Sequence, residues 1–246
     1  NNLLESYFSK LNLLKKYPKK NNILANNKVF FGLSAIIILT LSYFLLPTLY
    51  NKDIAQVEIK NQILKKYNFN IKFNEKIRYG LLPKPHFVSK NLSILNNKRE
   101  IGVVQNFKAF IDSGNLFSID NLEINDLVLN KTDFNLNKND LLFFEKFLKM
   151  EPNENEIIFK KSNIFFKNLN EELLFLNKIN DSKFYFDPYN LENVLISKNE
   201  IFNVPYVIDL KNNKFQKKFS IKFNSKKIGL NIESNTNYDD LIKKGK

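Results

Sequence analysis

The sequence predicts a mainly β protein of the α+β class. A single transmembrane helix near the N-terminus precedes an antiparallel, curved, groove-forming β-sheet with one or two helices. Three observations support this prediction. Residues 29–50 contain no charged side chain. From residue 69 onward, apolar and polar side chains alternate with the period of two that half-buried strands show. Hydrophobic residues make up 43% of the chain and aromatic residues 14%, which is enough to fill a core and excludes a wholly disordered chain.

Composition also excludes several classes of function. The 246 residues include no cysteine and one histidine, His86, so disulfide frameworks, thiolate catalysis and cysteine- or histidine-rich metal sites lack their ligands. No P-loop, G-x-G-x-x-G or G-x-S-x-G motif occurs. We therefore expect no enzyme activity, no catalytic residue, no metal and no cofactor. We interpret His86, in Pro-His-Phe, as a surface or turn residue.

The chain is basic, with 38 Lys+Arg against 25 Asp+Glu and a net charge of +13. Beyond residue 50 the lysines are interleaved with acidic residues and asparagines, and the only arginines are Arg78 and Arg99. A nucleic-acid interface more often shows a clustered, arginine-containing stripe. We expect a solvated lysine-rich surface and no nucleic-acid partner.

Residues 1–28 are predicted to form a cytoplasmic extension that is amphipathic and basic. A lysine cluster at residues 15–20 follows apolar residues that recur at helical spacing, namely Leu3, Leu4, Tyr7, Phe8, Leu11 and Leu14. Two interpretations remain open for this segment. It lies on anionic lipid, or it docks on another part of an assembly.

Residues 29–50 read VFFGLSAIIILTLSYFLLPTLY. As a helix with a rise of about 1.5 Å per residue, this run is about 33 Å long and crosses a hydrocarbon core of about 30 Å. A buried core helix seldom lacks charge over such a length, and no small-residue cleavage site follows, so an uncleaved signal anchor is expected. The side chains expected inside the bilayer are Val29, Phe31, Ile36, Ile37, Ile38, Leu41, Phe44 and Leu46.

The flanking charges predict the orientation of this helix. Six lysines precede it, and Lys52, Lys60, Lys65 and Lys66 follow it. The bias is modest but favours a cytoplasmic N-terminus under the positive-inside rule. Residues 51–246 then lie across the membrane, which in a bacterium is the periplasm.

After the membrane segment, Ile54, Val57, Ile63, Leu64 and Tyr67 mark one side of a helix. A strand or hairpin is then predicted over residues 69–81, ended by the turn around Pro83 and Pro85.

Further short strands are predicted along the rest of the chain, with one helix over Asp140–Lys149. The strand candidates are residues 101–111, 122–124, 127–129, 157–159, 164–166, 173–176, 184–186, 194–196, 207–210, 219–223 and 228–232. Alternation alone leaves two arrangements open, an open curved sheet with an apolar concave side and a closed sandwich.

The order of these features resembles the N-terminal region of the AsmA family of envelope proteins, which includes AsmA-like and TamB-like members. The resemblance rests on the stretch Phe69–Phe87, the KNLSI strand Lys90–Ile94 and the alternating strand Val103–Asp112, and covers residues 29–136. The chain departs from the family in its cytoplasmic extension and in Asn68, where a glycine is often found. Members are usually much longer, so a domain truncated at its C-terminus is expected.

The resemblance implies an inner-membrane anchor that carries a periplasmic β-sheet with a lipid-binding groove. It also implies a role in outer-membrane assembly or maintenance, through phospholipid transport between membranes and regulation of protein targeting to the membrane. Expected partners are membrane lipids and envelope proteins. The groove candidates are Phe69, Ile71, Phe73, Ile77, Ile101, Val103, Phe107, Ile119, Leu122 and Ile124.

Two other functions stay open at this stage. The domain serves as a non-transporting envelope scaffold that binds a partner through an exposed sheet edge. Alternatively, it is a small anchored β-domain that resembles lipopolysaccharide-export components, for which a natural C-terminus near Lys246 is expected.

Overall fold

The computed structural model describes residues 27–96, 98–140, 143 and 155–237, and the chain divides into two units after Leu45. Most of the predicted cytoplasmic extension, residues 1–26, lies outside the described residues. The first unit contributes the helix α2 (Asn27–Leu45), and the second contributes a sheet with one α-helix and three short 3-10 turns. Each unit is described by itself.

Helix α2 is apolar around its whole circumference. Ile36, Ile37 and Ile38, which point in different directions, have exposed fractions of 62%, 59% and 62%. The apolar segment Phe30–Leu49 has a mean hydropathy of 2.1 and is long enough to cross a membrane. Beyond Leu45 the backbone tightens into the 3-10 turn η1 (Leu46–Leu49) around Pro47, so the α-helix ends before the predicted limit at residue 50.

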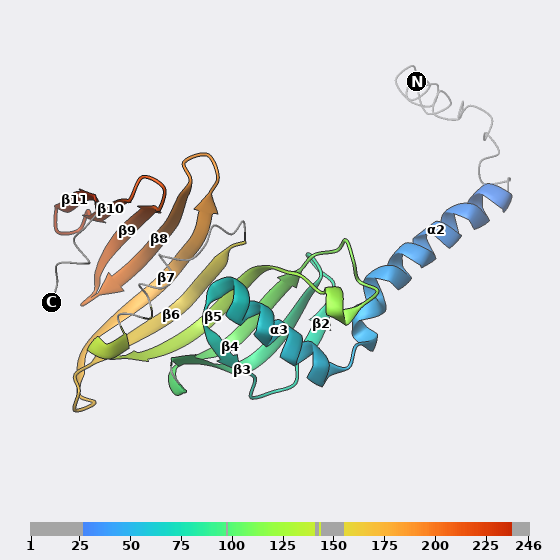
Figure 1. Cartoon of the computed structure of the whole chain (residues 1–246), viewed down its shortest axis with the longest axis horizontal. Helices are drawn as coiled ribbons and strands as arrows, with labels where there is room; N and C mark the ends of the chain where they lie inside the picture. The colour runs from blue at the N-terminus through green and yellow to red at the C-terminus, as the bar shows by residue number, and fades with distance from the viewer. Residues whose placement is uncertain (1–26, 97, 141–142, 144–154, 238–246) are drawn as a thin grey trace, which may run out of the picture. The chain divides into compact units, whose positions relative to one another are not determined.

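The second unit is an open, curved sheet of eleven strands (Figure 1). The strands are β1 (Asn70–Lys72), β2 (Arg78–Gly80), β3 (His86–Asn96), β4 (Arg99–Ile111), β5 (Ile124–Leu136), β6 (Ile157–Lys167), β7 (Leu173–Asp187), β8 (Glu192–Ile201), β9 (Val204–Asn213), β10 (Lys218–Ser225) and β11 (Leu230–Asn237). From β3 to β11 each strand pairs with the next in sequence. The mainly β fold with an open sheet is therefore confirmed.

The prediction of an antiparallel sheet needs one correction. Strands β5 and β6 run parallel, whereas the other pairs are antiparallel. Between them lies a connection that begins with the 3-10 turn η3 (Lys138–Asp140). Parallel neighbours need a crossover that returns the chain to the starting end of the sheet, so they cannot be joined by a tight hairpin. The helix predicted for Asp140–Lys149 falls in this connection, and apart from Asp140 and Phe143 it lies outside the described residues.

The strand or hairpin predicted over residues 69–81 was also wrong in its pairing. Its two pieces, β1 and β2, are three residues long each, and both pair with β3 instead of with each other. They therefore share one edge of the same strand.

The helix predicted after the apolar segment is α3 (Lys52–Tyr67). Asn51 caps its N-terminus by accepting hydrogen bonds from the backbone N–H groups of Asp53 and Ile54 at 2.9 and 3.2 Å. Asn68 ends it in the left-handed region, with φ of 53°.

The buried face of α3 agrees with the predicted one at Ile63 and Tyr67 and differs from it at the other positions. It consists of Ala55, Ile59, Ile63 and Tyr67, whereas Ile54, Val57 and Leu64 are exposed by 52%, 58% and 41%. Ile54 and Val57 lie outside the buried stripe. The sequence did not indicate this stripe because the small Ala55 was not counted among its apolar residues.

Strand register identifies one face of the sheet, which we call the inner face. Directly paired residues point to the same side, so one row of pairs can be followed across the sheet from β4 to β11. That row is Phe107, Leu129, Phe159, Ser182, Ser197, Ile208, Phe223 and Ile232. Phe107 and Leu129 are 1% and 0% exposed, whereas Ile232 at the far edge is 50% exposed.

A line of exposed residues, which we call the crease, crosses the first strands of the sheet. It consists of Asn91, Gln105, Lys131 and Lys161, which face one another in the register of β3–β6. Asn91, Lys131 and Lys161 have left-handed φ values of 51°, 55° and 49°. Each such residue rotates its strand, so that the alternation is offset by one position beyond it.

The crease explains why strands were predicted in short pieces. On β5 the buried residues are Leu127 and Leu129 before Lys131, but Thr132 and Phe134 after it. The candidates 157–159 and 164–166 are likewise the two halves of β6. The candidates 173–176 and 184–186 both belong to β7, where the register shifts between Ile179 and Asp181 instead. The apolar side chains of both halves of a strand stay on the inner face because the alternation is offset by one position at the crease.

Helix α3 and the segment after β1 cover the inner face over the first strands. Phe87 pairs with Ala109 of the inner face, and it lines a small hollow together with Ala55 of α3. The rings of Phe73 and Phe107 are in edge contact, 6.1 Å apart. Gln62 and Lys66 bind the backbone at the start of β5, where Lys66 Nζ donates to the carbonyl oxygen of Ile124 at 2.7 Å. In Figure 1, α3 lies across β4 and β5.

The opposite, outer face is polar and carries cross-strand ion pairs. Lys178 pairs with Glu200 at 2.8 Å, and Lys222 pairs with Glu233 at 3.0 Å. Both are directly opposite in the register, where unlike charges stabilise a sheet by a few tenths of a kcal/mol. The charged side chains of these pairs therefore lie on the outer face, which also carries some apolar residues, such as Val194 and Ile196.

The crease gives a test of the fold. A lysine in the left-handed region costs about 1 kcal/mol, whereas asparagine tolerates this backbone conformation. Lys131→Asn is expected to raise the free energy of unfolding by about 0.5–1 kcal/mol, and the melting temperature by about 1–4 °C. The measurement is thermal unfolding of the full chain in detergent, followed by circular dichroism because the chain has no tryptophan.

Lys160→Asn is the matched control. Lys160 is the exposed residue before Lys161 on β6, and its φ is not in the left-handed region. Its replacement should leave the melting temperature unchanged or lower it slightly, because asparagine disfavours strands. Equal shifts in the two variants would show that the crease stores no strain.

Candidate functional site

The structure places the ten groove candidates mostly inside the covered part of the sheet. Seven are buried, with exposed fractions of 4% or less: Phe69, Ile71, Ile77, Ile101, Phe107, Leu122 and Ile124. Phe73, Val103 and Ile119 are half-buried. Phe107 and Ile124 are on or beside the inner face, but α3 and Phe73 cover them. Val103 alternates with the buried Val104 and so points to the outer face.

A larger apolar pocket lies farther along the same face, over β5–β9. Its volume is about 310 Å³, at the lower end of the range for small-molecule pockets. The lining residues are Phe134, Phe159, Ile164, Asn177, Ile179, Ser182, Phe184, Leu195, Ser197, Asn199, Tyr206, Ile208 and Leu210. No charged residue is among them, and none of the ten groove candidates is either.

The register shows that the pocket belongs to the inner face. Phe159, Ser182, Ser197 and Ile208 of its lining are members of the row that begins at the buried Phe107. The covered core and the pocket are thus two parts of one surface. The difference between them is α3, which lies over the first part and not over β7–β9 (Figure 1).

Phe134 is the wall between the covered core and the pocket. Its ring is 5.8 Å from that of Phe159, and only 2% of the residue is exposed. Gly102 faces it on β4, where a Cβ atom would lie 2.8 Å from Phe134 Cδ1. A glycine inside a strand often marks such a close approach, so Gly102 was the sequence signal that could have pointed to Phe134.

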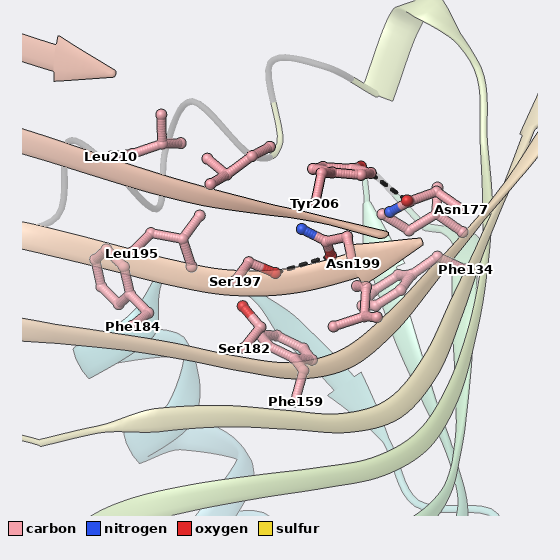
Figure 2. Close-up of a pocket in the computed structure, with 13 residues that line it drawn as sticks. Phe134, Phe159, Asn177, Ser182, Phe184, Leu195, Ser197, Asn199, Tyr206 and Leu210 are labelled. Atoms are coloured by element: carbon pink, nitrogen blue, oxygen red, sulfur yellow. Dashed lines mark hydrogen bonds between the residues drawn. The ribbon is translucent and has the colours of Figure 1, made fainter. Parts of the chain in front are cut away.

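Hydrogen bonds fix the polar side chains at the rim and the floor of the pocket (Figure 2). Tyr206 Oη donates to Asn177 Oδ1 at 2.8 Å, and Ser197 Oγ donates to Asn199 Oδ1 at 2.9 Å. Burial raises the pKa of Tyr206 above its ordinary value, so its hydroxyl stays protonated and remains a donor at neutral pH. The pocket is therefore uncharged as well as largely apolar.

The buried carboxylate of Asp140 has a structural role. It is 2% exposed and accepts hydrogen bonds from Asn96 Nδ2 at 3.1 Å and Asn137 N at 2.9 Å, in addition to its ion pair with Arg99. Burial raises the pKa of Asp140, but the hydrogen bonds from Arg99, Asn137 and Asn96 outweigh this effect and hold the pKa below its ordinary value. A fully paired, ionised carboxylate of this kind anchors a turn and is not available as a general base.

His86 corrects the prediction of a surface residue. It is 5% exposed, its Nδ1 lies 2.7 Å from the carbonyl oxygen of Lys84, and its ring packs on Phe110 at 5.3 Å. Gly80 makes room for the ring, because a Cβ there would lie 2.8 Å from His86 Nε2. Within the described ranges, no group of three His, Cys, Asp or Glu residues is arranged to hold a metal ion.

Comparison of the chain with protein-family models and with curated proteins gives no match. The case for a function rests on the geometry of the inner face.

The hydrogen bond at the pocket rim can be tested by Tyr206→Phe. The variant leaves Asn177 Oδ1, in a residue that is 7% exposed, without its donor, which should lower the free energy of unfolding by about 1 kcal/mol. Thermal unfolding should show a melting temperature about 2–4 °C lower. Tyr189→Phe is the control, since Tyr189 is 96% exposed and its loss of a hydroxyl should change nothing. Equal melting temperatures for the two variants would contradict the assignment.

Proposed function

We propose that this chain is a membrane-anchored lipid-binding protein of the AsmA-like type. In this proposal α2 crosses the inner membrane of a bacterium, the N-terminus is cytoplasmic and the sheet lies in the periplasm. The inner face of β5–β11 forms a groove that holds or conveys a lipid acyl chain during outer-membrane assembly or maintenance.

The observation that carries this proposal is the part of the inner face that α3 does not cover. From the pocket, apolar side chains continue through Phe223 to Ile232 at the edge, and the rings of Tyr206 and Phe223 stack at 4.9 Å. The charged side chains of the same strands lie on the outer face, as in the pair Lys222–Glu233. A soluble domain that needed only a closed core would cover such a surface.

The energetics favour an acyl chain as the occupant. Each methylene group removed from water is worth about 0.8 kcal/mol, so a chain crossing an aqueous compartment needs continuous shielding. The pocket supplies apolar walls from several strands and no charge that would have to be desolvated. A phosphate would find no cationic side chain among the lining residues, so this group would remain at the solvated surface.

The apolar helix α2 supports the membrane part of the proposal. A helix that is apolar all round is typical of a bilayer span or of a large protein core. Only 6% of its apolar segment is buried within the structure. Thr40 satisfies its own hydroxyl by donating to the carbonyl oxygen of Ile36 at 2.8 Å, as a residue in hydrocarbon must.

Photocrosslinking tests the lipid proposal at a position inside the pocket. A photoreactive amino acid at Leu195, irradiated in cells, is expected to yield an adduct with a membrane lipid that mass spectrometry identifies. Leu195 is half-buried on β8 and lines the pocket, so its side chain would lie against the bound chain.

Lys198 on the same strand is the matched control. It is exposed on the outer face, where no lipid adduct is expected. Phe107, which is 1% exposed beneath Phe73, should also give none. A folded protein that forms no lipid adduct at Leu195, or forms equal amounts at Leu195 and Lys198, would refute the proposal.

The edge strand β11 favours a second candidate function, that of an envelope scaffold. All its residues are exposed, and β10 is its only partner strand within the described part of the chain. Natural edge strands are often protected by lysine or proline, and β11 contains neither. An extended segment of a protein partner could pair with this edge.

Ser234→Lys separates the two functions. Ser234 lies on the inner side of β11, opposite Ile221, and a charge that points inward on an edge strand disfavours further pairing. If the scaffold function holds, a stoichiometric partner in affinity purification should be lost while the lipid adduct at Leu195 persists. Ser220→Lys, on the outer face of β10, should retain the partner. Loss of the partner in both variants, or in neither, would argue against edge pairing.

A further inference from the structure

The middle of the pocket is polar, and its two ends are mainly apolar, with Asn177 and Tyr206 at one of them. Ser182 of β7 and Ser197 of β8 are directly paired, and Asn199 is the next inner-face residue on β8. Their exposed fractions are 4%, 7% and 4%. Figure 2 shows the three side chains grouped between the strands. We call them the polar centre.

Apolar walls flank the polar centre on both sides along the strands (Figure 2). On one side are Phe184, Leu195 and Leu210, which pair across β7, β8 and β9. On the other side are Phe134, Ile164 and Ile179, beside the hydrogen-bonded pair of Tyr206 and Asn177. An occupant that extends along the strands therefore meets an apolar wall, then polar groups, then a second apolar wall.

The hydrogen bond within the polar centre leaves hydrogen-bond donors and one acceptor facing the pocket. Ser197 Oγ donates to Asn199 Oδ1 at 2.9 Å, which leaves the Ser197 oxygen able to accept and the Asn199 amide N–H groups able to donate. Ser182 Oγ makes no hydrogen bond to any residue that the structure describes. Ser182 Oγ is not one of the buried atoms left without a partner, which are Thr132 Oγ1 and Asp209 Oδ1 among the described residues, so water reaches it in the empty pocket. An occupant that displaces this water without pairing with the hydroxyl loses about 1–3 kcal/mol, and an occupant that pairs with it avoids the loss.

We propose that the pocket selects a single acyl chain that carries a hydroxyl group part-way along its length. The hydroxyl group of the ligand accepts hydrogen bonds from Ser182 and Asn199 and donates a hydrogen bond to Ser197 Oγ. The two apolar walls hold the hydrocarbon on either side. This inference rests on the proposed lipid-binding function and narrows its ligand class, since an unsubstituted chain would leave the polar centre unpaired.

The size of the pocket agrees with one chain and not with a whole two-chain lipid. A volume of about 310 Å³ is at the lower limit for pockets that enclose a small molecule. A charged occupant is disfavoured in this part of the pocket because no charged side chain lines it.

Two positional isomers of one fatty acid test the inference in the unaltered protein. The probes are 12-hydroxystearate and 2-hydroxystearate, which carry the same groups but place the hydroxyl mid-chain or beside the carboxylate. Their dissociation constants are measured on the full chain in amphipol, by displacement of a fluorescent fatty acid. We expect the mid-chain isomer to bind about tenfold more tightly, as for one to two buried hydrogen bonds.

Ser182→Ala should reduce this preference to less than twofold. It should also tighten the binding of plain stearate, which cannot pair with the serine hydroxyl. Ser182→Thr keeps the hydroxyl and should retain most of the preference. Ser220→Ala, the same deletion on the outer face of β10, should leave the preference intact. Circular dichroism of each variant reports whether the sheet is folded.

The outcomes separate this inference from the proposed function. If stearate and both isomers displace the fluorescent acid equally well, the chain binds acyl groups but the polar centre does not select them, and the inference is wrong. The same conclusion follows if the preference survives in Ser182→Ala. If no fatty acid displaces the probe and Leu195 yields no lipid adduct, the proposed function fails together with the inference.

Discussion

The structure depends on one constraint, which is that the apolar side chains that form the core and the pocket of a long, open sheet must remain on the same side. Strict alternation would achieve this on a flat sheet, but the alternation of this chain is broken in the middle of several strands. The crease at Asn91, Gln105, Lys131 and Lys161 restores it, because each left-handed residue turns its strand over by one position. The core, the pocket and the exposed edge all lie on the face that results.

The covering helix divides that face into parts with different physical roles. Beneath α3 the inner side chains reach the burial of an ordinary core, as the 0% exposure of Leu127 and Leu129 shows. Beyond Phe134 the same rows continue without α3 above them. Ser182 and Ser197 are still buried there, whereas Ile208 and Phe223 are half-buried and Ile232 is exposed. The two arrangements left open by the sequence, a closed interior and an open apolar surface, therefore occur in one sheet at different distances from the helix.

The sequence was informative wherever a local pattern determines the structure. It predicted the apolar helix, the helix that follows it and a one-faced β-sheet, because charge-free length and strand alternation are local properties. It could not reveal the pocket, because Phe134 and Phe159 come together only through the parallel pairing of β5 with β6. It divided β6 into pieces because nothing in the sequence marks Lys161 as left-handed, and β7 because the register shifts between Ile179 and Asp181. It also could not show that α3 covers Phe107 and Ile124, which depends on long-range contacts such as that between Lys66 and Ile124.

The crease has a consequence for tolerance to mutation along this chain. Lys131 and Lys161 are exposed and make no ion pair among the described residues, so hydropathy and burial would both mark them as freely exchangeable. Valine or isoleucine, which suit an ordinary strand, are poorly accommodated at positive φ. Such a replacement at Lys131 would favour regular alternation along β5. The side chains beyond it would then change faces, and Phe134 would face water. Exposed positions can thus be among the least replaceable in a sheet when their backbone conformation, and not their side-chain contacts, determines the fold.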